Sequence, residues 1–230
     1  MRAMKWIAGL LFPRRAVCMG CGDMTGCDRD DICEDCRRAM ADGWVGVRPA
    51  AKRSFIDGAA FAYRYRGPAG GVVRSLKYGS VWLLAEEMGR DVARAAEMLK
   101  ITDLNVVTAV PMHPKRLRAR DRNHSELIAR SAAQRLGVSY GELLARTRNA
   151  PQQARLSNAE RRRNLKGGFA ALPDGAEAIR GRTVLLIDDV WTTGATAESC
   201  AEALKAAGAA HVYFAAYAYG EKKNGKNKQR

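Results

Sequence analysis

The segment that most constrains the fold lies at residues 184–196 (VLLIDDVWTTGAT). The apolar run at residues 184–187 has the length and composition of a buried parallel strand, and two carboxylates follow it directly. A small, hydroxyl-rich turn then opens a predicted helix at residues 195–207. Backbone N–H groups and a helix N-terminus at the carboxyl end of a parallel strand bind anions. The segment therefore predicts a phosphate site at the carboxyl edge of a parallel sheet.

The residues of this segment fall into two chemical groups. Asp188 and Asp189 repel phosphate, so they are suited to the hydroxyls of an adjacent sugar or to water on a magnesium ion. The turn supplies hydroxyl and backbone donors, and its glycine permits a close approach of the backbone to a ligand. The expected phosphate contacts are Thr192, Thr193, Gly194, Ala195 and Thr196.

The same thirteen residues resemble the phosphoribosyl pyrophosphate (PRPP) signature of type I phosphoribosyltransferases. The resemblance implies that Asp188 and Asp189 hold the ribose hydroxyls, that residues 192–196 hold the 5′-phosphate, and that magnesium accompanies PRPP. Agreement over the whole segment disfavours an ordinary strand–turn–helix with two solvated aspartates. Thr192 stands where purine-base transferases usually carry an acid, which disfavours hypoxanthine or guanine salvage. The sequence has no G-x-x-x-x-G-K-[ST] run, which excludes a P-loop ATPase.

The rest of the chain predicts an α/β fold with a mostly parallel sheet flanked by helices. Apolar residues alternate at residues 55–65, which predicts a strand with one buried face, and the glycine-rich residues 67–71 predict a turn. The further predicted elements are a helix at residues 81–100, a strand at 105–110, a helix capped by Ser125 and a strand at 211–219. Strands that alternate with helices form a mostly parallel sheet with both faces covered.

Five of the six cysteines fall between residues 18 and 36, as two C-x-x-C pairs and one cysteine between them. Each pair can put two thiolates on one metal ion, and four thiolates form a closed, structural zinc site. The expected ligands are Cys18, Cys21, Cys33 and Cys36. Cys27 is a spare thiol, a fifth candidate ligand or an oxidation partner, and Cys200 is expected to pack in the core. Such clustering is typical of metal binding in a reducing cytoplasm.

The chain is strongly basic, with 39 Lys and Arg against 24 Asp and Glu and a net charge of +15. This charge favours partners that are rich in phosphate. Two basic segments, at residues 111–122 and 153–166, could bind pyrophosphate or the backbone of a nucleic acid. A solvated charged surface is the alternative for each. The candidate contacts are Lys115, Arg116, Arg118 and Arg161.

No apolar run approaches the roughly 20 residues that span a bilayer, so we expect no stable membrane insertion. The apolar start of the chain is followed by Pro13, Arg14 and Arg15 instead of a small-residue cleavage site, so it predicts a short helix packed on the body. We expect a cytoplasmic protein.

The order of motifs along the chain resembles the ComF family. The matching segments are residues 11–13 (LFP), 76–79 (LKYG), 111–118, 125–127 (SEL), 153–164 and 188–196. The chain departs from the family at residues 120–124, where R-D-R-N-H replaces the usual R-G-F-N-Q. The resemblance implies a zinc-bearing head on a phosphoribosyltransferase fold, and participation in the uptake or use of DNA. We expect a head with a zinc ribbon at residues 1–48, a phosphoribosyltransferase-like domain at 49–220 and a basic, disordered tail at 221–230.

Three functions are compatible with these features. The leading hypothesis is an accessory protein of DNA uptake that binds PRPP with magnesium and also binds single-stranded DNA, with other DNA-uptake proteins as further candidate partners. The rival is an active phosphoribosyltransferase that releases pyrophosphate from PRPP, and the sequence does not decide whether turnover occurs. A PRPP-sensing regulator of duplex DNA is the weakest, because the sequence has no helix-turn-helix signature.

Overall fold

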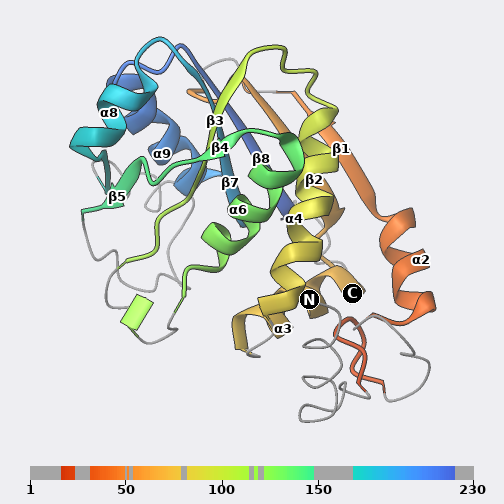
Figure 1. Ribbon diagram of the computed structural model, residues 1–230. Helices are drawn as coiled ribbons and strands as arrows, with labels where there is room; N and C mark the ends of the chain where they lie inside the picture. Colours follow the sequence, from red (N-terminus) through yellow and green to blue (C-terminus); the bar gives the residue numbers. More distant parts are fainter. Residues whose placement is uncertain are drawn as a thin grey trace, which may run out of the picture.

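The computed structural model describes residues 17–23, 32–49, 51, 54–78, 82–113, 117–118, 122–147 and 168–220. Its centre is a six-stranded sheet in the order β1-β2-β8-β7-β3-β4 (Figure 1). The strands are β1 (Trp44–Arg48), β2 (Gly58–Arg64), β3 (Leu104–Ala109), β4 (Ser139–Tyr140), β7 (Thr183–Trp191) and β8 (His211–Tyr219). Neighbouring strands are parallel, except that β1 pairs antiparallel with β2. The expected mostly parallel sheet is confirmed.

Helices cover both faces of this sheet, as Figure 1 shows for α4 and α6 on one side and α9 on the other. The helices are α2 (Glu34–Asp42), α3 (Gly67–Tyr78), α4 (Trp82–Glu97), α6 (His124–Leu136), α8 (Pro173–Ile179) and α9 (Ala195–Ala206). A separate antiparallel pair consists of β5 (Leu144–Arg146) and β6 (Phe169–Ala171).

The central strand β7 contributes to two cores. Leu185 and Ile187 pack in the cluster that contains the apolar residues of α3, α4 and α6, whereas Val184 and Leu186 pack in the cluster that contains those of α9. All four side chains are fully buried. Successive residues of a strand point to opposite faces of its sheet, which explains the division. The strand is therefore apolar on both faces, as its sequence predicted.

Helices α4 and α6 approach each other closely at Gly89. A Cβ atom at this position would collide with the side chain of Ser131 and would lie 2.8 Å from the backbone oxygen of Ile128. The Ser131 hydroxyl instead donates a hydrogen bond to the backbone oxygen of Glu86, at 2.9 Å. Because protein interiors tolerate little overlap, this contact fixes the position of α6 on the sheet.

Strand β2 differs from its prediction. It is shorter than residues 55–65, and Ala59–Ala62 are buried without alternation. β2 lies between β1 and β8, and Ala62 packs in the α4 and α6 cluster while Phe61 packs in the opposite one. The prediction of one buried face is wrong because both faces of this interior strand are covered.

Three other local predictions are wrong at element ends. Residues 67–71 form the first turn of α3 rather than a separate turn, since Pro68 has no N–H to lose there. Ser125 does not cap α6, which begins at His124 with Asn123 as its N-cap. The strand expected at residues 184–187 continues to Trp191, because pairing with β8 extends to that residue.

The predicted helices before β3 and after β7 are confirmed as α4 and α9, and strands β3 and β8 lie close to their expected bounds. The predicted N-terminal helix and the basic tail at residues 221–230 lie outside the described residues. Within the described ranges, no helix has both the length and the apolar character that crossing a bilayer requires. Strand β1, at the end of the predicted head, hydrogen-bonds to β2 and extends the main sheet.

Candidate functional site

The candidate site lies at the carboxyl edge of the sheet, where β7 leads into α9. Asp188 and Asp189 belong to the last part of β7, and Asp188 is opposite Ala216 of β8. The neighbouring strand β3 ends at the same edge, since the N–H group of Val110 donates to the backbone oxygen of Ile187 at 2.9 Å. The aspartate pair and the start of the segment that follows β3 therefore lie at the same edge of the sheet.

The turn at residues 192–194 opens α9 in the manner that the sequence predicted. Gly194 is the N-cap, with a φ of 77°, and its carbonyl accepts the N–H of Glu198 at 2.9 Å. The hydroxyl of Thr193 accepts the N–H of Ala195 at 3.4 Å. The backbone thus directs the first N–H groups of α9 toward the edge that carries the two carboxylates.

Aromatic side chains pack against this turn. The ring of Trp191 packs edge-on against Phe214, with centroids 5.0 Å apart, and against Phe61, with centroids 5.5 Å apart. A Cβ atom on Gly194 would collide with the Trp191 ring. Glycine is therefore required at this position for two reasons: its left-handed backbone conformation and the proximity of the indole.

Each carboxylate has a partner from a different helix. The hydroxyl of Ser125, on α6, donates to Asp188 Oδ1 at 2.6 Å, and the N–H of Asp189 donates to the same oxygen at 2.9 Å. Lys77, near the end of α3, places its Nζ 2.7 Å from Asp189 Oδ2. Burial and the adjacent charge of Asp189 raise the pKa of Asp188 to about 7, against the effect of these partners. Two carboxylates of this kind can accept hydrogen bonds from a diol or bind water on a divalent cation.

Sequence reasoning assigned no role at this site to Lys77 or Ser125. Both lie in short segments, residues 76–79 and 125–127, that carry the resemblance to the ComF family. That was a signal of importance, but nothing in the spacing connects these segments with the aspartate pair. Only the packing of α3 and α6 on the sheet brings them there.

The predicted basic contacts are mostly outside the described residues, since Lys115, Arg116 and Arg161 are not described. Arg118 is exposed, in the short described stretch 117–118. The N–H of Leu117 donates to the backbone oxygen of His113 at 2.9 Å, so this stretch lies close to the end of β3.

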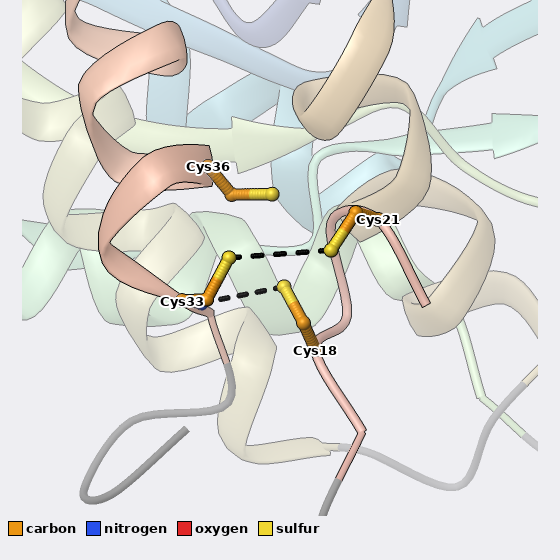
Figure 2. Close-up of side chains that lie close together, drawn as sticks. All are labelled: Cys18, Cys21, Cys33 and Cys36. Atoms are coloured by element: carbon orange, nitrogen blue, oxygen red, sulfur yellow. Dashed lines mark hydrogen bonds between the residues drawn. The ribbon is translucent and has the colours of Figure 1, made fainter. Parts of the chain in front are cut away.

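The four predicted cysteine ligands form a second candidate site. Figure 2 shows Cys18 and Cys21 on a loop and Cys33 and Cys36 at the start of α2, with their sulfur atoms directed into one space. All four sulfur atoms lie within 4.8 Å of one another, and those of Cys21 and Cys33 are 4.0 Å apart. Zinc–sulfur bonds of about 2.3 Å in a tetrahedron require sulfur separations of about 3.8 Å. The cluster could therefore hold a metal ion.

Backbone N–H groups surround the sulfur atoms and favour their thiolate form. Gly20 and Cys33 donate N–H groups to Cys18 Sγ, each at 3.3 Å, and Asp23 donates to Cys21 Sγ at 3.5 Å. Burial opposes the charge on Cys18, but these donors outweigh it and lower the pKa of Cys18 to about 6. Burial and neighbouring thiols raise the pKa of Cys36, which disfavours a second thiolate in the cluster. A bound cation would stabilise the thiolate form of both cysteines. Cys27 lies outside the described residues, and Cys200 is buried in the core as predicted.

Helix α3 connects the two candidate sites. A Cβ atom on Gly71 would collide with the backbone oxygen of Gly20, within the first cysteine pair. The Ser75 hydroxyl donates to the backbone oxygen of Met19 at 3.2 Å. The loop that carries Cys18 and Cys21 thus contacts α3 directly, and the last turn of the same helix carries Lys77, beside Asp189.

The packing of Trp191 predicts the cost of a side chain in the turn. Gly194→Ala should destabilise the protein by about 1–2 kcal/mol for the left-handed backbone and by about 1–3 kcal/mol more for overlap with the indole. Gly181→Ala is the control, because Gly181 has a φ of 69° but nothing within 4 Å of its Cβ position. Urea denaturation measures both. Equal losses for the two variants would contradict the role of Trp191 as a support for the turn.

Comparison with known proteins agrees with this architecture. Residues 123–229 match the model of the phosphoribosyl transferase domain. The DNA utilization protein YhgH of Escherichia coli (strain K12) is 31% identical over 156 residues, which cover 64% of this chain and 66% of that protein. Its Salmonella typhimurium counterpart is 34% identical over 122 residues, 52% of this chain and 51% of that protein. The matches thus cover just under two thirds of the length of the Escherichia coli protein and about half of the length of the Salmonella protein.

Solved structures include an allosteric regulatory enzyme of purine biosynthesis, with a TM-score of 0.43 and 21% identity over 63% of this chain and 30% of that one. The glutamine PRPP amidotransferase from B. subtilis has the same TM-score and identity, over 62% of this chain and 30% of that one. The domain match, the relatives and the parallel α/β sheet agree with one another. The domain match and the relatives therefore support the resemblance of this chain to phosphoribosyltransferases of the ComF type.

Proposed function

We propose that this protein binds PRPP together with magnesium and acts in the cytoplasm as an accessory protein of DNA uptake and utilisation. One observation carries the proposal: two adjacent carboxylates lie at the carboxyl edge of β7, directly before a glycine-opened turn at the N-terminus of α9. The two carboxylates suit a sugar diol, and the turn at the N-terminus of α9 suits a phosphate. PRPP contains both groups at the separation of a single ribose ring.

The proposed binding mode assigns each part of PRPP to a part of the site. The 5-phosphate accepts N–H donors from the turn and from α9, and hydroxyl donors from Thr192, Thr193 and Thr196. The ribose hydroxyls donate to Asp188 and Asp189. Magnesium, when bound with PRPP, neutralises part of the pyrophosphate charge. The chain's own contribution is to hold the two carboxylates in place, through Ser125 and Lys77.

The role in DNA utilisation rests on the relatives and on charge. The similar proteins from Escherichia coli and Salmonella typhimurium are named DNA utilization proteins. The net charge of +15 favours a polyanion, and one of the two basic segments begins just after β3, at the same edge as the aspartate pair. Single-stranded DNA is the proposed partner, and proteins of DNA uptake are further proposed partners.

Turnover is the second candidate function, and the phosphoribosyl transferase domain match favours it. An acceptor would attack C1 of the ribose as the bond to pyrophosphate breaks. Thr192 cannot remove a proton from a purine at neutral pH, so such an acceptor would need another base or none. Incubation with magnesium, PRPP and a panel of nucleophiles distinguishes the two functions. Acceptor-dependent release of pyrophosphate supports the enzyme, and binding without release supports the accessory role.

The aspartate pair provides the direct test of PRPP binding. Replacing both Asp188 and Asp189 by Asn keeps the shape but removes the charge that acts on the diol and on magnesium. Titration calorimetry with magnesium and PRPP should show binding at least about tenfold weaker, a loss of ~1.4 kcal/mol. Asp57→Asn is the control, since Asp57 is also paired with a lysine, Lys205, but lies just before β2. Unchanged affinity in a folded double variant would show that the pair does not bind PRPP.

The cysteine cluster should hold one zinc ion per chain. Zinc fits because four thiolates saturate its tetrahedral coordination. Elemental analysis of protein purified without added metal should find this zinc, and a variant with both Cys33→Ser and Cys36→Ser should lose it and become less stable. Cys200→Ala, which leaves the cluster intact, should retain it. An iron–sulfur absorbance band, or folded protein without metal, would rule out the zinc assignment.

The protein should bind single-stranded DNA with little sequence preference and with strong salt dependence. Each phosphate neutralised contributes a log–log salt slope of about −0.7. Replacing Arg116 and Arg118 by Glu should weaken binding at every sequence and flatten this slope. Arg135→Glu with Arg180→Glu makes the same change of net charge at exposed positions elsewhere, so it is the matched control. If fluorescence anisotropy at low salt detects no complex, or the two double variants bind alike, the basic loop is not a DNA contact.

A further inference from the structure

Lys77 is the basic side chain that the described structure pairs with the aspartate pair. It lies in the last turn of α3, and its Nζ is 2.7 Å from Asp189 Oδ2. The two side chains are 24% and 12% exposed, so the pair is largely enclosed but still reaches the surface. Lysine carries three N–H donors, of which this contact with Asp189 uses one. The ammonium group can therefore hold Asp189 and a second acceptor together.

The position of Lys77 relative to the turn follows from the faces of the sheet on which α3 and α9 pack. Helix α3 packs on one face of the sheet, in the cluster that contains Leu185 and Ile187 of β7. Helix α9 packs on the other face, in the cluster that contains Val184 and Leu186. The Lys77 ammonium thus lies on the face of the sheet opposite α9, whereas residues 192–194 lead into α9. The aspartate pair lies between the two.

PRPP has the same linear order of groups. The 5-phosphate is joined to one side of the ribose ring, the two hydroxyls follow, and C1 with its pyrophosphate comes next to the second hydroxyl. With the 5-phosphate at the N-terminus of α9 and the hydroxyls on the two carboxylates, C1 lies toward α3. A cation next to Asp189 is then within reach of the pyrophosphate oxygens.

We propose that Lys77 binds the pyrophosphate group of PRPP while it keeps its contact with Asp189. This inference rests on the proposed PRPP function and names the residue that recognises the C1 substituent. The charge requirement supports it, since the aspartate pair alone repels a polyanionic ligand and Lys77 offsets that repulsion where the pyrophosphate approaches.

The anchoring of α3 makes Lys77 suitable for this task. Gly71 rests on the backbone of Gly20, and the hydroxyl of Ser75 donates to the backbone oxygen of Met19. Helix α3 is therefore held near its middle by the loop of the first cysteine pair. Binding of a ligand by a side chain on an anchored helix requires less ordering than binding by a side chain on an unsupported loop.

The test compares three ligands on matched variants. Titration calorimetry with magnesium measures PRPP, ribose 5-phosphate and inorganic pyrophosphate on the wild-type chain, on Lys77→Met and on Lys77→Arg. Lys205→Met is the control, because Lys205 forms a 2.8 Å ion pair with Asp57 and its side chain is 25% exposed, close to the value for Lys77. Thermal melting reports whether each variant is folded, and Lys77→Gln replaces Lys77→Met if the latter is not.

We expect Lys77→Met to weaken PRPP and pyrophosphate binding at least tenfold while ribose 5-phosphate affinity changes less than threefold. Lys77→Arg should recover most of the loss, and Lys205→Met should bind all three ligands as the wild type does. Equal weakening of PRPP and ribose 5-phosphate would mean that Lys77 only positions Asp189, which overturns the inference. Unchanged PRPP affinity in Lys77→Met overturns it as well. A wild-type chain that does not bind PRPP refutes the proposed function instead, and the inference fails with it.

Discussion

The structure depends on one strand that is buried on both faces and yet carries two carboxylates. Strand β7 lies between β3 and β8, and its apolar half is fully enclosed by two cores. The same strand continues through Asp188 and Asp189, whose charges are costly to bury without partners. Neighbouring helices supply those partners: Ser125 from α6 and Lys77 from α3. The position of both helices on the sheet therefore determines the chemistry of its carboxyl edge.

Helix α3 contacts both the cysteine head and the edge of the sheet that carries the aspartate pair. Met19, Ile32 and Met40 of the head pack in the same core as α3, and the four clustered cysteines could add the stability of a bound metal ion. The first cysteine loop of the head contacts α3 through Gly71 and Ser75, and Lys77 lies a short distance along the same helix. A single helix therefore contacts both the loop of the first cysteine pair and the aspartate pair.

The proposed accessory role and the rival enzyme need the same site but differ in the fate of the bound PRPP. Both require a phosphate at α9, a diol at the aspartate pair and positive charge for a pyrophosphate. The net charge of +15 is larger than a site for one small ligand needs, which favours a second polyanionic partner. One basic segment begins just after β3, at the edge where PRPP is proposed to bind, so the two ligands would meet there.

The sequence by itself determined the features that depend on neighbouring residues in the chain. The apolar run before Asp188 predicted a buried parallel strand, the small, hydroxyl-rich turn predicted the start of α9, and paired C-x-x-C motifs predicted the sulfur cluster. These are local properties: composition, spacing and backbone conformation. The match to a type I phosphoribosyltransferase signature likewise lies within thirteen consecutive residues.

Only the tertiary structure decided the features that join distant segments. It buried both faces of β2, converted a predicted glycine turn into the start of α3, and turned the Ser125 hydroxyl from a helix cap into a donor to Asp188. It also brought Lys77 to Asp189 across more than a hundred residues of chain. Period and propensity describe one segment at a time, whereas these contacts arise because helices that pack on a common sheet bring their ends to the same edge.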